Sequence, residues 1–152
     1  MAEVLEEFLA RRHIAVLGTQ NPSGSIQLAA IWYMHEGGDI YLPTTPGSVK
    51  VRNLRERPSA SVVVDSRHPE PLKTASGSGA AEVIEGDAAR ELNQRIFRRY
   101  MSDEAIADPA VGGYMIENDV VTIRLRPERW NWVDLEAAFG GLFEPGYLKP
   151  LG

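Results

Sequence analysis

The sequence predicts a mainly β protein, an antiparallel barrel of six to seven strands with flanking helices. Three observations lead to this class. Short apolar or β-branched runs alternate with turn-forming residues along most of the chain, and only two helical patterns interrupt the series of strands. A length of 152 residues is enough to bury one core without disulfides. We therefore expect a single domain over residues 1–152, closed as a barrel.

The N-terminal residues 1–12 are predicted to form an amphipathic helix, because Val4, Leu5, Phe8 and Leu9 lie on one helical face. The first strands then follow as an antiparallel meander with turns at 21–24 and 36–39, and are expected at residues 14–17, 25–35 and 40–42. Both faces of the second run are mostly apolar, so we expect this strand to be central in the sheet.

A short helix is predicted to begin after Ser48, a suitable N-cap, and to end before Pro58. The later elements are expected to be strands at 60–65 and 72–84, a helix at 87–100, a loop with one helical turn at 101–113, and strands at 120–125 and 129–133. Glycines within 76–79 predict a bulge or a close backbone approach. The apolar C-terminal arm, residues 134–152, is expected to be extended and buried against the barrel or a partner subunit.

Composition and charge exclude several classes of protein. The chain has 16 Lys and Arg against 21 Asp and Glu, a net charge of -5, and no Cys. This balance argues against nucleic-acid binding, and the lack of Cys excludes thiolate metal sites and thiol nucleophiles. The three His residues lack metal-ligand spacing, so we expect no metal site. No apolar run reaches the ~18–20 residues that cross a bilayer and the first residues are acidic, so we expect a cytoplasmic protein without membrane contact.

One segment departs from the acidic average and predicts a site for an anion. Four positive charges lie within Lys50–Arg57, directly after three hydroxyl residues, Thr44, Thr45 and Ser48. The start of a helix adds unpaired N–H groups and the positive end of the helix dipole, which together suit a phosphate. The alternative is a solvated basic helix whose hydroxyls only cap its end.

Residues 40–58, IYLPTTPGSVKVRNLRERP, resemble the hallmark segment of the pyridoxamine 5'-phosphate oxidase-like flavin proteins. In that superfamily a Thr, then Gly-Ser-x-Lys, then Arg-Asn-Leu and a Pro follow the third strand. Further segments resemble the same family in the same order: HIAVLGTQNPSGSIQLAAIWY (13–33), ASVVVD (60–65), GSGAAEVIEG (77–86) and RPERWNWVDL (126–135). Order and spacing together carry the resemblance, because no single motif is decisive.

The resemblance implies a split β-barrel homodimer with a flavin or deazaflavin in each of two clefts between the subunits. It implies cofactor-binding roles for eight residues, namely Gln27, Trp32, Thr44, Ser48, Lys50, Asn53, Lys73 and Trp132. The phosphate arm would be held by Thr44, Ser48, Lys50 and Asn53, and the polar edge of the cofactor would be contacted by Lys73. Trp132 would approach from the partner chain. Gln27 and Trp32 fall on opposite faces of one strand, so at most one of them should touch the ring.

For Trp132 a second interpretation stays open. Trp130 and Trp132 are two residues apart on a predicted strand and share a face, and such aromatic pairs commonly pack in a core or an interface rather than against a cofactor.

The sequence departs from the true pyridoxamine phosphate oxidases, because residues 28–33 carry no charge where those enzymes have basic residues. A vitamin B6 oxidase is therefore not expected. The uncharged strand and the Lys-x-Arg-Asn-Leu helix look closer to the branch that uses coenzyme F420, and FMN remains an alternative.

The resulting hypothesis is an oxidoreductase that transfers a hydride between F420 or FMN and a small organic acceptor. The alternative is a non-catalytic carrier of flavin, F420 or haem. No catalytic residue is identified, and the proton could come from solvent, Tyr33 or Tyr41.

Overall fold

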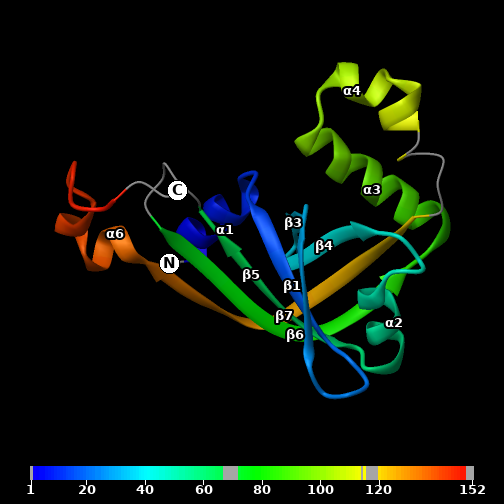
Figure 1. Ribbon diagram of the computed structural model, residues 1–152, viewed down its shortest axis with the longest axis horizontal. Coiled ribbons are helices and arrows are strands. Elements are labelled where there is room, and N and C mark those ends of the chain that lie inside the picture. The colour runs from blue at the N-terminus through cyan, green and yellow to red at the C-terminus, as the bar shows by residue number, and fades with distance from the viewer. Residues whose placement is uncertain (1, 67–71, 114, 116–119, 150–152) are drawn as a thin grey trace.

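A seven-stranded antiparallel sheet, curled into a half-barrel, forms the frame of the protein (Figure 1). The computed structural model describes residues 2–66, 72–113, 115 and 120–149. The strands are β1 (Ile14–Gln20), β2 (Ile26–Ile31), β3 (Met34–Glu36), β4 (Asp39–Thr44), β5 (Ser59–Asp65), β6 (Lys73–Ile84) and β7 (Val121–Asp134). Their order in the sheet is β2-β1-β5-β6-β7-β4-β3. The predicted mainly β class with flanking helices is confirmed.

The helices are α1 (Ala2–Ala10), α2 (Val49–Glu56), α3 (Gly86–Tyr100), α4 (Asp103–Ala107) and α6 (Leu135–Ala138), with a π turn at Pro109–Gly113 and a 3-10 turn at Gly140–Phe143. The three predicted longer helices are confirmed. The expected loop at 101–113 contains two short helical elements instead of one turn. No helix of the described residues is long and apolar enough to cross a membrane.

The core lies on the concave side of the sheet. Alternate residues of the central strands point inward and are fully buried, among them Leu17, Leu42, Val64, Ile123 and Leu125. Helix α1 adds Phe8 and Leu9 to this cluster, and α2 adds Val51 and Leu54. The apolar stripes that predicted both helices are therefore the faces that pack on the sheet.

The predicted second strand is broken, and its central placement was wrong. The hydrogen-bonding pattern stops at Trp32 and Tyr33, and β2 pairs with β1 while β3 pairs with β4, at the two opposite edges of the sheet. The outer face of β2 is open, with Ile26 60% and Leu28 67% exposed. A strand with apolar residues on both faces, such as β2, is therefore not always buried on both faces in a single chain.

The two predicted final strands form one strand, β7, of fourteen residues. The interruption expected near Pro127 is absorbed by a register shift opposite Ser78 and Gly79. A side chain at Gly79 would overlap the carbonyl oxygen of Arg126, so the backbones approach more closely than any larger residue allows. The predicted close approach in this segment is confirmed.

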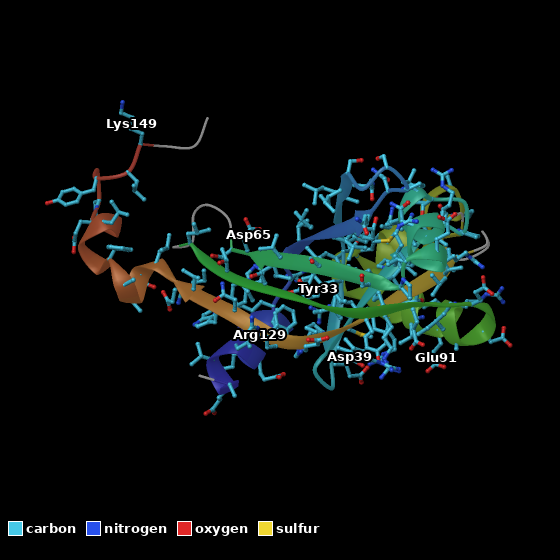
Figure 2. The ribbon with its side chains drawn as sticks, turned by 90° about the horizontal axis from the view of Figure 1, so that it is seen from below. Tyr33, Asp39, Asp65, Glu91, Arg129 and Lys149 are labelled. Carbon is cyan, nitrogen blue, oxygen red and sulfur yellow. The ribbon has the colours of Figure 1, made fainter. Side chains whose placement is uncertain are left out.

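The described part of the C-terminal arm is helical rather than extended and is not buried against its own barrel, while its burial against a partner subunit stays a prediction. The Asp134 side chain accepts a hydrogen bond from the Ala137 amide (3.0 Å) and caps α6. The arm therefore begins with a helical turn. Figures 1 and 2 show the arm, with Lys149 near its tip, reaching away from the sheet. Four of its large apolar side chains are exposed, those of Phe139, Leu142, Tyr147 and Leu148, with Tyr147 at 71%. Residues 150–152 lie outside the described residues.

His35 joins α1 to β3 in a buried contact. Its side chain is only 3% exposed, and its Nδ1 atom lies 3.4 Å from Glu6 Oε2. Its Nε2 atom is buried with no partner among the described residues, so protonation would place an unpaired N–H in the interior. Burial therefore lowers the pKa of His35, against the opposing attraction of Glu6 and Asp39.

This arrangement predicts a loss of stability in mild acid. A histidine whose pKa is lowered by folding contributes full stability above its unfolded value of 6.5 and loses it as the pH falls below that value. Replacing His35 by Gln should reduce the difference in the free energy of unfolding between about pH 7 and pH 5. Urea unfolding at both pH values measures it, and an unchanged difference would contradict the prediction.

Candidate functional site

The N-terminal end of α2 carries a pair of hydroxyls. Thr44, the last residue of β4, donates from Oγ1 to Ser48 Oγ at 3.2 Å. Ser48 has the extended backbone expected of an N-cap, but its side chain makes no capping hydrogen bond. The first N–H groups of α2 therefore keep no side-chain acceptor, and an acceptor on a ligand suits them.

Two of the four cations predicted to serve this end are neutralised within the chain. Arg55 pairs with Glu85, and Arg57 pairs with Glu56 at 2.9 Å and also donates to the Gln20 carbonyl. Lys50 and Arg52 have no carboxylate partner among the ion pairs of the described residues. The positive charge left for a ligand is thus concentrated on these two residues.

Lys50 is the more informative of the two, because its side chain is half-buried while Arg52 is exposed. Burial without an anionic partner lowers the pKa of Lys50. A half-buried ammonium beside free helix N–H groups and hydroxyls is the donor set that holds a phosphate, so these residues fit a phosphorylated cofactor.

Asn53 has a different position from its predicted neighbours in the site. Its side chain is buried, at 1% exposure, and its Nδ2 atom donates to Thr19 Oγ1 at 3.1 Å and to Asn21 Oδ1 at 3.0 Å. Thr19 in turn donates to Gln27 Oε1 at 3.3 Å. Both amide N–H groups of Asn53 are used inside the chain, so Asn53 fixes α2 against the β1–β2 hairpin.

Trp32 lies away from this network, at the break between β2 and β3. Its indole ring stacks on the Tyr100 ring, with centroids 5.0 Å apart and planes 2° from parallel, and meets Phe97 edge-on at 6.3 Å. Gln27 and Trp32 therefore have separate surroundings, the polar network under α2 and an aromatic cluster at the end of α3.

Tyr33 lies in the interior of the molecule (Figure 2) and is fully buried. Its hydroxyl donates to the carbonyl oxygens of Leu9 (2.9 Å) and Arg11 (3.1 Å). Burial raises the pKa of Tyr33 far above its ordinary value. In the single chain the Tyr33 hydroxyl is thus occupied by backbone acceptors and closed to solvent.

The remaining predicted residues, Lys73 and Trp132, lie at the far end of the sheet. Lys73 Nζ is 3.5 Å from Asp134 Oδ2 and 3.5 Å from Glu136 Oε2. Trp132 is partly buried and meets Phe8 of its own chain edge-on, with ring centroids 4.9 Å apart. In the single chain Trp132 is thus a packing residue.

The length of β7 gives the separation between the α2 end and the pair Lys73 and Trp132. Thr44 pairs with Val121 at the start of β7, and Trp132 lies eleven residues further along the same strand. At ~3.3 Å per residue this is roughly 35 Å of curved strand. A single chain therefore does not bring Trp132 and Lys73 to a small molecule bound at α2.

The outer face of the sheet is a feature that sequence reasoning missed. Two adjoining hollows of about 560 and 340 Å³ share Ser61, Val62 and Ser76. The larger one is lined without a charged side chain, by Val16, Gly18, Thr19, Gln20, Ile26, Leu28, Ser59, Ala60, Ser61, Val62, Val63 and Ser76. The signal for this face in the sequence was the small and apolar residues at every second position of β1, β2, β5 and β6.

Comparison with known proteins gives one family. The sequence model of the family described as pyridoxamine 5'-phosphate oxidase matches residues 1–134. The chain is similar to the crystal structure of a conserved hypothetical protein from Mycobacterium tuberculosis, with 25% identity, a TM-score of 0.72 and coverage of 100% of this chain and 91% of that one. No curated protein matches the chain.

Two further solved structures share the fold. One is described as an F420 reductase, with 23% identity, a TM-score of 0.65 and coverage of 83% of this chain and 94% of that one. The other is the haem storage protein from Vibrio cholerae, with 16% identity, a TM-score of 0.66 and coverage of 87% and 92%. Proteins with different ligands thus use this architecture.

Proposed function

Because the chain belongs to the pyridoxamine 5'-phosphate oxidase family, we propose that it is an oxidoreductase that uses bound FMN or coenzyme F420 to reduce a small organic acceptor. Family membership agrees with the resemblance carried by residues 40–58. When bound, the reduced cofactor supplies a hydride to the acceptor. The protein's own part is to hold the anionic arm of the cofactor and to position the acceptor.

The observation that carries the proposal is the state of Lys50. It is a half-buried cation without a carboxylate partner among the described residues, and burial lowers its pKa. The Thr44–Ser48 hydroxyl pair and the uncapped start of α2 lie next to it in the sequence and point to the same ligand chemistry. A phosphate there would offset the cost of burying Lys50, for which the ion pairs of the described residues include no carboxylate.

We also propose that the working form is a homodimer with the cofactor between the subunits. Trp132 and Lys73 are separated from the α2 end by most of β7, so they can join one cofactor only from a second copy. The larger hollow on the outer face supports this arrangement, because its lining has no charged side chain and an unpartnered surface of this kind is typical of an interface.

Replacing Lys50 by Met tests the cofactor site. Loss of a charge-assisted bond should weaken binding of FMN or F420 by about 10- to 100-fold, equivalent to about 1–3 kcal/mol. The apoprotein should be as stable as the wild type or more so, because the substitution removes a half-buried charge. Titration followed by cofactor fluorescence measures the first effect, and thermal unfolding the second.

Lys149→Met is the matched control, since Lys149 is exposed on the C-terminal arm. Unchanged cofactor affinity in Lys50→Met would rule out the assigned site. The same titrations, repeated with haem, separate the enzyme from a carrier. Tight binding of a cofactor whose reduced form passes no hydride to nitro or enone acceptors would favour the carrier.

A further inference from the structure

The C-terminal arm, described after β7 over residues 135–149, projects from a fixed root. The Leu135 amide donates to the Leu72 carbonyl at 3.1 Å, and Lys73 Nζ lies 3.5 Å from Glu136 Oε2. These contacts hold the direction of the arm where it leaves the sheet. The arm begins after the last residue that the family model matches, so membership of the family assigns it no role.

Beyond this root the arm carries apolar side chains that its own chain does not cover. Phe139, Leu142 and Tyr147 are all exposed. Glu144 lies among them, is exposed as well, and forms no ion pair with a described residue. An apolar surface with a charge inside it is typical of a protein interface, because the apolar groups supply affinity and the charge sets the orientation of the partner.

The outer face of the sheet has the complementary composition. One row of paired positions crosses it from β2 to β7 and consists of Leu28, Gly18, Ser61, Ser78 and Arg129. Side chains at paired positions share one face of a sheet, so the row runs from an exposed apolar residue to an exposed cation. Arg129 forms no ion pair with a described residue and lines the smaller hollow, whose second charged residue is Glu128.

In a single chain the C-terminal arm points away from this row. Figure 2 shows Arg129 beside the sheet and Lys149 near the tip of the arm, well apart. The two features nevertheless adjoin at the root of the arm, because Asn131 lines the smaller hollow and β7 ends soon after it, at Asp134. A second copy placed on the outer face is therefore within reach of the arm.

We infer that the C-terminal arm of each copy packs on the outer face of the other in the homodimer, where its apolar side chains cover the larger hollow around Leu28 of the partner subunit. Glu144 then pairs with Arg129 of the partner subunit, so each charge gains the partner that one chain does not provide. A two-fold dimer contains this contact twice, so a change at one position acts twice. The inference rests on the proposed homodimer for the presence of the second copy.

A charge exchange between copies tests the inference. Arg129→Glu should raise the dissociation constant of the dimer at least tenfold, because Glu144 then faces two carboxylates, that of Glu128 included. Glu144→Arg should have a smaller effect, because Glu128 attracts the new cation. Mixing the two variant proteins should give a dimer at least tenfold tighter than that of Arg129→Glu alone, since opposite charges meet at both contacts of a mixed dimer. Sedimentation velocity over a dilution series measures these constants, and native mass spectrometry identifies the mixed dimer.

Arg98→Glu is the matched control. Arg98 is exposed on α3, forms no ion pair with a described residue, and its replacement changes the net charge by the same amount. The mixture of Arg98→Glu with Glu144→Arg should dimerise no more tightly than Arg98→Glu alone. A dimer as tight in Arg129→Glu as in the wild type, or no gain on mixing Arg129→Glu with Glu144→Arg, overturns the inference.

The same measurement separates the arm contact from the proposed function. A dimer that Arg129→Glu weakens and Lys50→Met leaves unchanged supports the arm contact whatever the cofactor. Loss of cofactor binding in Lys50→Met, together with a dimer that Arg129→Glu does not weaken, sinks the arm contact and leaves the proposed function standing. A wild-type protein that is monomeric at every concentration overturns the arm contact and the proposed homodimer together.

Discussion

Replacing Gly79 by Ala should lower the free energy of unfolding by about 3 kcal/mol or more, which for a domain of this size is a large part of its stability. The added Cβ would overlap the Arg126 carbonyl oxygen and lie within 2.9 Å of the carbonyl carbon. Both atoms belong to the backbone of β7, so no side-chain rotation relieves the overlap. The strands must separate at the register shift, within the longest pairing of the sheet.

Urea unfolding followed by circular dichroism measures the loss. Gly47→Ala is the control, because a Cβ at Gly47 meets nothing within 4 Å and its backbone does not require glycine. We expect that variant to be within about 0.5 kcal/mol of the wild type. Equal stabilities for the two variants would show that β6 and β7 are not packed as closely at Gly79 as described.

Replacing Leu28 by Glu should convert the proposed homodimer to a monomer and weaken cofactor binding by 100-fold or more. Leu28 is 67% exposed on the outer face of β2 and lines the larger hollow, so the substitution does not disturb the core. In a dimer formed through this face the carboxylate would be buried without a partner, at a cost of several kcal/mol. Cofactor binding falls with it, because the site is divided between two copies.

Light scattering after size-exclusion chromatography measures the mass, and titration with FMN and F420 measures the affinity. Val111→Glu provides the comparison, since Val111 is 43% exposed in the π turn after α4 and remote in sequence from this face. A Leu28→Glu protein that remains dimeric and binds cofactor as tightly as the wild type would refute the proposed interface. A circular dichroism spectrum like that of the wild type verifies that it is folded.

Local sequence signals predicted most elements because their causes are local. Short apolar or β-branched runs beside turn residues identified β1, β4 and β5, and the helical stripe identified α3 with its buried Ile96. The glycines of 76–79 predicted the close approach of β6 and β7. These properties depend on the geometry of one strand or one helix, which a few residues determine.

The errors concern properties that depend on distant partners. Apolar residues on both faces of 25–35 suggested a central strand, but the outer face has no neighbour in its own chain. Residues 120–125 and 129–133 were expected to form two strands, and a register shift opposite Gly79 accommodates the residues between them within one strand. The apolar arm suggested an extended segment, but it forms helical turns, and its Tyr147 is 71% exposed in one chain.

The sequence predicted which residues form the candidate site, but not which of its cations are neutralised within the chain. The helix start, its hydroxyls and Lys50 were visible as a motif. Pairing of Arg55 with Glu85 was not, because Glu85 lies 30 residues away and meets Arg55 only after β5 and β6 have formed. The hydrogen bonds of Asn53 were not visible as a motif either, because its amide donates to Thr19 and Asn21 of the first hairpin, which are distant in the sequence.

The break at Trp32 and Tyr33 has a consequence for aggregation. An exposed sheet edge carries unpaired N–H and C=O groups that can add a strand from another molecule. Here a single segment of chain supplies both outermost strands, the six residues of β2 and the three of β3. A longer edge lies inside the sheet, because β4 covers only the first five residues of β7 and residues 126–134 pair with β6 alone. The two outermost strands thus offer little backbone for intermolecular strand addition, and the open part of β7 carries Pro127 and the charged Arg126, Glu128 and Arg129, which oppose it.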